Sequence, residues 1–592
     1  MSSKPSCLYY KELSQMSPVR AMAESLFNSR NSAQSLRRVT APELYEMACR
    51  SPHSAVTDLP MDRTAVARLG LKEDAKVFNW NHGDVVGRSA EARVFYNRIS
   101  PAEKTAVQAL LREALYELQS GHRLVFCEAV VGTHPDMMIK ARLLGPEEDA
   151  ANMFAWLANF NPLEAVPQYE TSKLLHTQDI LFVAYPAWTP RHDYLRSLYP
   201  DWYKDPQNSR WRRGCVVVDE KHKTIYNLGL RYFGERKKGT LTMAWTAGMD
   251  MGAVAAHASI KEIDLSACQG YQHRGKQIIS FYGLSGSGKS SHANSRDNGG
   301  TLPSGFKAAI AHDDAFQIDY VNRKCYVWEP SLFDKTDSRD PDSPDWKYCI
   351  CTQNMAVCQT GGKIVPYGRD LRNNNGRAIF SRELLGETVN VIGFPHHVCW
   401  LMKDSTLPPI MRLTNPDLAV TMGATLMTKR TAAENISAEE MKKLVFMPFA
   451  NPFRVYELWR DCIGYHEIFN AGAAGYVWNS GGSGMWKNSD AEVTPIPLST
   501  SLALQTALLT GRLTWEDYPY IDGAQIPSRE SIEKILPGYY ETYSPAAMGN
   551  LDGYKETLRD RFQQRRDFLI NSDIKEKPEL LARMVGALKT TV

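Results

Sequence analysis

The chain is 592 residues long, which predicts two or more domains. Its composition, with 43% hydrophobic and 23% charged residues, is typical of a globular protein with large cores. The net charge of +3 argues for no particular partner, and we expect no nucleic-acid partner, which would require a concentrated basic face. No apolar run reaches the roughly 18 residues of a membrane span, and the N-terminus lacks the apolar core of a secretory signal. The 11 cysteines show no disulfide or zinc spacing, which favours a reducing compartment.

Residues 1–38 leave two interpretations open. Their arginines and serines, with few acids, resemble a mitochondrial transit peptide. A plain N-terminal helix with a loose tail also fits the charged residues Lys4, Lys11, Glu12 and Glu24. We treat residues 1–40 as an N-terminal extension and expect a cytoplasmic location, with mitochondrial targeting as the alternative.

The first half of the chain predicts mixed α/β structure. Apolar spacing predicts a helix over residues 41–50, with Thr40 as its cap, and an amphipathic helix over residues 101–119. Runs of β-forming residues predict short strands at 124–131, 138–144, 180–184 and 215–218. No internal repeat and no low-complexity linker separates this half from the second.

Two charged stretches and one histidine in this half are candidates for chemistry. Arg88, in the turn Gly87-Arg88-Ser89, could form a bidentate hydrogen-bonded pair with a carboxylate or phosphate. A lone arginine is more often a solvated surface charge. The segment YFGERKKG holds two adjacent lysines, which in isolation also indicate surface charge. His257, in GAVAAHAS, is by itself more often a buried core residue than a ligand.

The stretch QIISFYGLSGSGKSS carries the strongest chemical signal. Its apolar start predicts a buried strand, and the run that follows fits the P-loop pattern of glycine, four residues, glycine, lysine, then serine or threonine. Glycines let the backbone turn its N–H groups toward a phosphate chain, and the next helix adds its positive N-terminus. The sequence therefore predicts a nucleoside triphosphate site, in which Lys289 reaches the outer phosphates and Ser290 holds a divalent metal. The predicted nucleotide-binding residues are Gly283, Leu284, Ser285, Gly286, Ser287, Gly288, Lys289, Ser290 and Ser291.

The segment AAIAHDDAF predicts an apolar strand that ends in Asp313 and Asp314. In P-loop enzymes an acidic residue at the end of a neighbouring strand completes the metal shell. A helix cap or a turn is the structural alternative for this pair.

The C-terminal part predicts structure but no function. Apolar spacing indicates a helix over residues 502–509, packed beneath the nucleotide loop, and residues 537–543 read as a loop. A long charged helix is predicted over residues 550–570, with an apolar stripe formed by Leu551, Tyr554, Leu558, Phe562 and Leu569.

Together, these motifs resemble the ATP-type phosphoenolpyruvate carboxykinase family. GRSAEARVFY is similar to the family's GRSPKDKY, YFGERKKG to YxGEMKKG, and FYGLSGSGKSS to FGLSGTGKTT. Further along, IAHDDAF resembles IGDDEHGW, HHVCWLMKDSTLPPIMRLT resembles the segment that ends in LPPVSRLT, and GAAGYVWNSGGSG resembles GAxxYLVNTGWxG. The motifs follow the family's order and are spread over most of the chain.

The resemblance implies a two-lobed α/β fold with the active site in the cleft between the lobes. A substrate-side domain would span residues 41–270, and a P-loop domain for nucleotide and metals would span residues 271–592, with a lid-like segment at about 423–445. The implied reaction converts oxaloacetate and ATP to phosphoenolpyruvate, ADP and carbon dioxide, with Mg²⁺ and Mn²⁺ as cofactors. The implied partners are ATP and a small carboxylate, and the sequence does not predict an oligomeric state.

The resemblance also implies roles for individual residues. Arg88 and Arg377 would bind the substrate's anionic groups, with Tyr232 beside them. Arg369 and Arg372 lie close to Arg377 in sequence, so either of them could instead correspond to the family's second anion-binding arginine.

The implied metal ligands form a second set. Manganese would be held by Lys238, His257 and Asp314, with the lysine as a neutral amine, because only a deprotonated nitrogen can donate to a metal. Ser290 would serve magnesium, with Asp313 close by.

Several positions depart from the family pattern. Trp328 stands where the family has a lysine that contacts the transferring phosphate, and the segment Met485-Trp486-Lys487 lacks the usual arginine near the adenine. The stretch that includes residues 298–305 is longer than in the family. The lid-like region keeps little of the family pattern and predicts a helix start at Ser437.

These departures leave three hypotheses. The protein is a working carboxykinase in which Arg369, Arg372 or Lys324 replaces the missing lysine; or it phosphorylates a different small carboxylate, on which Trp328 could stack; or it binds nucleotide without catalysis and acts through a partner. The retained metal and P-loop residues disfavour the third hypothesis, and Trp328 favours the second over the first more than any other feature does.

Overall fold

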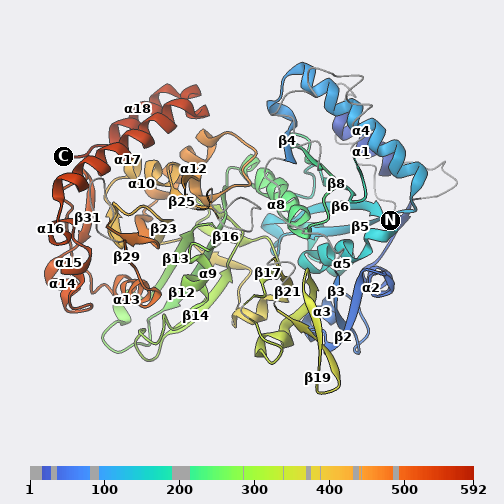
Figure 1. Ribbon diagram of the computed structural model, residues 1–592, viewed down its shortest axis with the longest axis horizontal. Coiled ribbons are helices and arrows are strands. Elements are labelled where there is room, and N and C mark those ends of the chain that lie inside the picture. Colours follow the sequence, from blue (N-terminus) through green and yellow to red (C-terminus); the bar gives the residue numbers. More distant parts are fainter. Residues whose placement is uncertain are drawn as a thin grey trace. The chain divides into compact units, whose positions relative to one another are not determined.

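Figure 1 shows the structure, a computed structural model, in which the chain divides into two compact units. Unit 1 comprises Met1–Ala247, Trp328–Leu384 and Ala433–Asn435, and unit 2 comprises Gly248–Val327, Leu385–Ala432 and Ile436–Val592. The domain boundaries expected from sequence stay a prediction. The structure describes residues 16–27, 36–80, 92–189, 214–284, 286–337, 339–368, 375–386, 388–430, 439, 441, 443–484 and 493–591.

Unit 1 contains a mixed sheet in the order β1-β5-β6-β8-β10-β9-β4, with β7 paired to β5. The four strands predicted from sequence in the first half are all present in it. The bounds are β1 (Arg37–Arg38), β4 (Arg93–Phe95), β5 (Leu124–Val131), β6 (Ile139–Pro146), β7 (Asn161–Pro162), β8 (Ile180–Tyr185), β9 (Cys215–Asp219) and β10 (Thr224–Leu228).

Local signals explain where the helices of unit 1 begin. The predicted helix after Thr40 is α2 (Ala41–Arg50), and it starts with a capping box in which Thr40 and Glu43 satisfy each other's backbone N–H groups. The same arrangement, made by Ser100 and Glu103, starts α4 (Pro101–Gly121). The other helices of this unit include α1 (Pro18–Phe27), α3 (Arg63–Arg68), α5 (Ala150–Asn159) and most of α8 (Phe233–Asp250).

Helix α1 is held to unit 1 by a buried arginine. Arg20 is fully buried, and its guanidinium lies 2.7 Å from a carboxylate oxygen of Glu24 and 2.7 Å from one of Asp179. The helix expected near the N-terminus is therefore present. The alternative that residues 1–38 act as a targeting segment stays a prediction.

A second sheet of unit 1 runs in the order β17-β21-β18-β3-β2. Cys349 and Cys351 lie buried in its strand β18, and all ten cysteines that the structure describes are free thiols. The bounds are β2 (Ser54–Pro60), β3 (Lys76–Trp80), β17 (Ser331–Lys335), β18 (Cys349–Gln353), β21 (Arg377–Ser381) and, in a separate hairpin, β19 (Ala356–Thr360) and β20 (Lys363–Tyr367).

The main sheet of unit 2 runs in the order β14-β12-β13-β23-β27-β24-β31-β30. Strands β13, β23 and β27 are parallel, so their carboxyl ends meet at one edge, where parallel α/β sheets bind ligands. The bounds are β12 (Ala258–Asp264), β13 (Lys276–Tyr282), β14 (Lys307–His312), β23 (His397–Met402), β24 (Ile410–Leu413), β27 (Ala474–Asn479), β30 (Trp515–Asp517) and β31 (Ala524–Pro527).

Smaller strand groups complete unit 2. One sheet has the order β11-β15-β16-β22, and two-stranded ladders join β25 to β26 and β28 to β29. The β25–β26 pair belongs to the lid-like segment, whose predicted helix start at Ser437 lies outside the described residues. The bounds are β11 (Val254–Ala256), β15 (Phe316–Asp319), β16 (Lys324–Val327), β22 (Val391–Gly393), β25 (Met427–Lys429), β26 (Leu444–Phe446), β28 (Gly482–Ser483) and β29 (Thr494–Pro495).

The C-terminal helices of unit 2 cover a large apolar core. The predicted charged helix is α17 (Leu551–Asn571), and the side chains of Tyr554, Leu558, Phe562 and Leu569 are buried in that core. Its neighbours, seen beside it in Figure 1, include α10 (Pro416–Ala424), α12 (Leu458–Asn470) and α18 (Pro578–Ala587).

One C-terminal expectation is wrong. Residues 537–543, predicted as a loop, contain the helix α15 (Tyr539–Tyr543). The carboxylate of Glu533 accepts the backbone N–H groups of Gly538 and Tyr540 at 2.6 and 2.8 Å. The helix forms because these N–H groups at its start thereby gain an acceptor, and Glu533 lies outside residues 537–543. The predicted helix over residues 502–509 is present as α13 (Leu498–Leu509). In the described part of the chain, no helix is both long and apolar enough to span a membrane.

Candidate active site

The glycine-rich segment lies between a buried strand and a helix, as predicted. Strand β13 ends at Tyr282, and α9 (Lys289–Asn294) begins directly after Gly288. Gly286 and Gly288 have φ values of +77° and +94°, a backbone conformation that glycine adopts without a steric cost. Leu284 and Ser287 close the turn through a backbone hydrogen bond of 3.0 Å. Ser285 lies outside the described residues.

Two predicted site residues of unit 2 converge on one carboxylate oxygen of a third, Asp314. Lys289 Nζ lies 2.9 Å from Asp314 Oδ1, and His257 Nε2 lies 3.3 Å from the same atom. Asp314 follows β14, and His312 Nδ1 fixes the turn by accepting the backbone N–H groups of Asp314 and Ala315. The structure thus brings together residues that are separated in sequence by the whole glycine-rich segment.

The hydrogen bonds of His257 indicate how its ring is used. Its Nδ1 lies 2.7 Å from the carbonyl oxygen of Ala450, so that nitrogen carries a proton and donates it. In the neutral ring Nε2 then holds a lone pair, which faces Asp314 Oδ1 at 3.3 Å. Two electron-rich atoms at this distance require a proton or a cation between them. An imidazole whose other nitrogen donates to a backbone carbonyl is also the usual metal-binding arrangement, so the pair fits a divalent cation.

The remaining predicted residues of unit 2 lie around this cluster. Asp313 Oδ2 accepts a hydrogen bond of 3.5 Å from Asn294 Nδ2 at the end of α9. Ser290 is partly buried in the first turn of α9, and Ser291 is exposed. Within the described residues, no group of three or more histidine, cysteine, aspartate or glutamate side chains is arranged to hold a metal ion.

A buried lysine that sequence reasoning missed closes the far end of α9. Lys261, on β12, is fully buried, and its ammonium donates to the carbonyl oxygens of His292 and Ser295, each at 2.7 Å, and to Asn298 Oδ1 at 2.9 Å. Three acceptors match the three N–H groups of an ammonium. Burial lowers the pKa of Lys261 to about 7, although Asp297 opposes this shift. These acceptors lie 31 to 37 residues away, so no short-range pattern could reveal them.

The long stretch after α9 has a structural role at the same place. Asn298 is buried in a left-handed conformation with φ +51°. Its Oδ1 binds Lys261, and its Nδ2 donates to Thr506 Oγ1 on α13 at 3.0 Å. The segment after α9 therefore ties this helix to strand β12 on one side and to helix α13 on the other.

In unit 1 the structure brings two predicted substrate-binding residues together. Arg377, the first residue of β21, donates from Nε to the hydroxyl of Tyr232 at 3.2 Å, and both side chains are buried. Tyr232 directly precedes α8, and its ring packs against Phe333 with the centroids 6.1 Å apart. Gln353, on β18, accepts the N–H of Phe233 at the start of α8, which fixes the position of Tyr232.

The two lysines of α8 have different surroundings. Lys237 is buried and lies 3.2 Å from a carboxylate oxygen of Glu329, whose other oxygen accepts a 2.6 Å hydrogen bond from Asn159. Lys238, the predicted metal ligand, is partly buried on the same helix in unit 1. The pair Lys237–Glu329 shows that adjacent lysines need not be surface charge.

Trp328, at the position where the resemblance leads us to expect a lysine, is fully buried in this structure. Its carbonyl oxygen accepts the N–H of Gly132 at 2.9 Å, and its indole Nε1 has no hydrogen-bond partner among the described residues. The ring is therefore not presented to solvent. Lys324, one suggested replacement for the lysine, is exposed at the opposite end of β16.

Arg88, Arg369, Arg372 and the segment 485–487 lie outside the described residues.

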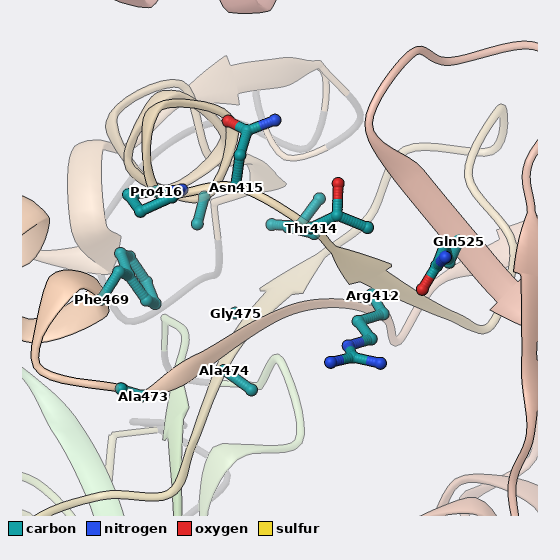
Figure 2. A pocket seen from close by; sticks show the side chains of 12 residues that line it. Arg412, Thr414, Asn415, Pro416, Phe469, Ala473, Ala474, Gly475 and Gln525 are labelled. Carbon is teal, nitrogen blue, oxygen red and sulfur yellow. The ribbon is translucent and has the colours of Figure 1, made fainter.

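A pocket of about 460 Å³ in unit 2 lies away from the cluster of Lys289, His257 and Asp314 (Figure 2). It adjoins Ala474, where β27 begins, whereas the glycine-rich turn follows the carboxyl end of the parallel strand β13. The pocket is therefore at the opposite edge of the sheet. Its lining, drawn in Figure 2, combines Phe469 and Pro416 with the polar side chains of Arg412, Asn415 and Gln525.

Comparison with known proteins identifies the class that this fold and site define. A family model described as phosphoenolpyruvate carboxykinase matches residues 84–529. The chain belongs to the ATP-type phosphoenolpyruvate carboxykinase family.

Two curated relatives were found at low identity. The glycosomal phosphoenolpyruvate carboxykinase (ATP) of Trypanosoma cruzi is 24% identical over 335 residues, which cover 54% of this chain and 65% of the relative. The phosphoenolpyruvate carboxykinase (ATP) of Aeropyrum pernix is 25% identical over 312 residues, which cover 51% of this chain and 59% of the relative. The chain thus spans less than two thirds of the length of either relative.

Proposed function

We propose that this protein is an ATP-dependent carboxykinase that converts oxaloacetate and ATP to phosphoenolpyruvate, ADP and carbon dioxide. Family membership supports the reaction class. The observation that supports it most is the convergence of Lys289 and His257 on one oxygen of Asp314, at 2.9 and 3.3 Å. A protein that only bound nucleotide would need the lysine but would have no use for a histidine aimed at the same carboxylate.

The proposed reaction has two bond-breaking steps. The bond between the methylene carbon of oxaloacetate and its carboxylate breaks, carbon dioxide leaves, and the electron pair forms the enolate of pyruvate. The enolate oxygen then attacks the γ-phosphorus of ATP in line, and the bond from that phosphorus to the bridging oxygen of ADP breaks.

Unit 1 would bind the organic acid. The guanidinium of Arg377 is buried and held at its Nε by Tyr232, so its outer edge is oriented before the substrate arrives. Arg88 would supply a second guanidinium for the other carboxylate. An arginine clamp of this kind places the scissile bond without taking part in the chemistry.

Unit 2 would bind the nucleotide. The amides of the glycine-rich turn and the ammonium of Lys289 would neutralise charge on the transferring phosphoryl group. Asp314 keeps that ammonium beside the turn through their 2.9 Å ion pair.

Divalent cations complete the proposal. Asp314 and His257 would give Mn²⁺ an oxygen and a nitrogen donor, and Ser290 would serve Mg²⁺ with Asp313 nearby. The family resemblance would add Lys238 to the manganese ligands as a neutral amine. A bound cation would stabilise the negative enolate oxygen and the phosphate charges. The role of the protein is to hold His257 in the correct tautomer, which the carbonyl of Ala450 does.

The second candidate, phosphorylation of a different carboxylate, rests on Trp328. A tryptophan that stacks on a substrate needs an open ring face, whereas Trp328 is fully buried. Its burial does not support the stacking hypothesis. Oxaloacetate therefore remains the substrate to test first.

The test is a coupled product assay. The purified protein is incubated with ATP, Mg²⁺ and Mn²⁺, with and without oxaloacetate, while phosphoenolpyruvate and ADP are followed together. We expect both products only with oxaloacetate, and we expect Lys289→Ala and His257→Ala each to lower kcat by about a hundredfold or more.

The matched control is Lys307→Ala, which removes an exposed lysine at the far end of β14. It should keep full activity. ATP binding without either product would reject the carboxykinase, and other carboxylates would then be screened as acceptors.

A further inference from the structure

We propose that Lys403 is a second phosphate-binding cation at the glycine-rich turn, where it contacts the polyphosphate of the bound nucleotide. The inference rests on the proposed function only in taking a nucleotide as the ligand. Lys403 lies within the segment HHVCWLMKDSTLPPIMRLT, for which the sequence analysis assigns no binding residue.

The first argument is position. Lys403 directly follows β23, the parallel neighbour of β13, and its Nζ donates to the carbonyl oxygen of Gly286 at 3.1 Å. The side chain therefore crosses from one strand end to the turn that follows the next strand. Carboxyl ends of adjacent parallel strands are where such sheets bind ligands.

The second argument is charge compensation. Lys289, the motif lysine, is paired with the carboxylate of Asp314 at 2.9 Å. Lys403 forms no ion pair with any described residue, and its three N–H groups have one described acceptor, the carbonyl oxygen of Gly286. Of the two lysines that the structure describes at this turn, Lys403 is thus the one whose ammonium is available for an anion.

The third argument is a second positive charge nearby. Lys429 ends β25, and β23 and β25 are joined where Lys403 N donates to Met427 O at 3.0 Å. Burial, and after it the charge of Lys429, lower the pKa of Lys403. Two lysines brought together without a described carboxylate repel each other, and a polyphosphate bound between them would remove that repulsion.

The structural alternative is that Lys403 only fastens the turn to β23. A fastening role predicts weaker binding of any ligand that needs the turn, with no change in ionic-strength dependence. A phosphate contact predicts a loss that grows with phosphate charge and is partly screened by salt.

The test compares ligands that differ in phosphate content. For Lys403→Met we expect the Kd of ATP and of ADP to rise about tenfold or more, because a hydrogen bond to a charged group is lost, and the Kd of adenosine to stay unchanged. The ionic-strength dependence of ATP binding should become shallower. Lys403→Arg should retain most of the affinity, and Lys307→Met, an exposed lysine elsewhere in unit 2, should bind as the unmodified protein does.

A second measurement uses the unmodified protein and so does not depend on the variant folding. The rate at which an amine-reactive reagent labels Lys403 is measured in the presence of ATP, inorganic tripolyphosphate or adenosine. Protection by the two polyphosphates but not by adenosine supports the proposal. If the polyphosphates leave the labelling of Lys403 unchanged, or if Lys403→Met binds ATP as tightly as the unmodified protein, the role of Lys403 is overturned. Nucleotide binding by the protein would still stand. Failure of the unmodified protein to bind ATP would instead overturn the proposed function.

Discussion

Lys261 shows how a single buried charge can organise the candidate site. Its ammonium has three oxygen acceptors at the end of α9, which is the helix that begins with Lys289. A cation at a helix C-terminus also interacts favourably with the helix dipole. The burial that lowers its pKa to about 7 is the energetic cost of placing it there.

At this scale we predict that Lys261→Met loosens α9. Three buried acceptors lose their donor, so the free energy of unfolding should fall by about 1–3 kcal/mol, and amide exchange should accelerate across residues 289–298. Hydrogen exchange and urea unfolding measure the two effects. Lys307→Met, which removes an exposed lysine on β14, is the control and should change neither. Equal protection of α9 in both variants would contradict the prediction.

His397 is a second buried group, placed in the parallel part of the unit 2 sheet. Burial, followed by the charges of His396, Arg274 and Arg412, lowers its pKa to about 3. Its Nε2 lies 3.2 Å from Gln277 Oε1, and its Nδ1 has no hydrogen-bond partner among the described residues. A proton added at Nδ1 would be buried without an acceptor.

The sign of the resulting pH dependence follows from the two pKa values. The unfolded chain binds a proton at His397 below pH 6.5, whereas the folded protein does not until about pH 3, so stability falls as the pH falls through this window. The loss is about 1.4 kcal/mol per pH unit. The free energy of unfolding, measured with urea between pH 7 and pH 5, should therefore decrease less with falling pH for His397→Gln than for the unmodified protein. Parallel pH profiles would refute the assignment.

At the scale of elements, α17 shows how one residue starts a long helix. Asn550 precedes the helix in a left-handed conformation, φ +47°, and its Oδ1 accepts the N–H of Gly553 at 3.1 Å. Asparagine suits this position because it tolerates positive φ and caps a helix at the same time.

The two roles of Asn550 can be separated by a pair of variants. Asn550→Ala loses the cap and strains the backbone, so we expect a loss of about 2 kcal/mol in the free energy of unfolding. Asn550→Gly relieves the strain and should lose less than half as much. Denaturant unfolding of both variants provides the measurement, and equal losses would show that the backbone conformation carries no cost.

At the scale of the whole molecule, each unit is built from more than one segment of the chain. Tyr232 and Arg377 of unit 1 are joined although the strand and turn that carry Lys289 and Asp314 in unit 2 lie between them in sequence. Local patterns predicted most strands, the capped helix after Thr40 and the strand–turn–helix at the glycines, because those depend on neighbouring residues. The helix at Tyr539–Tyr543 was predicted as a loop because its first N–H groups are satisfied from outside the predicted segment, by Glu533.

By itself, the sequence determined the family, the α/β class and the residue types at the candidate site, since motif spacing is a property of the chain alone. Only the tertiary structure decided which of these residues meet. It joined His257 and Lys289 at Asp314, buried Trp328, and brought Lys261 and Lys403 to the glycine-rich turn and its helix. Such contacts depend on how strands far apart in sequence are ordered in a sheet, and no pattern within a short window contains that order.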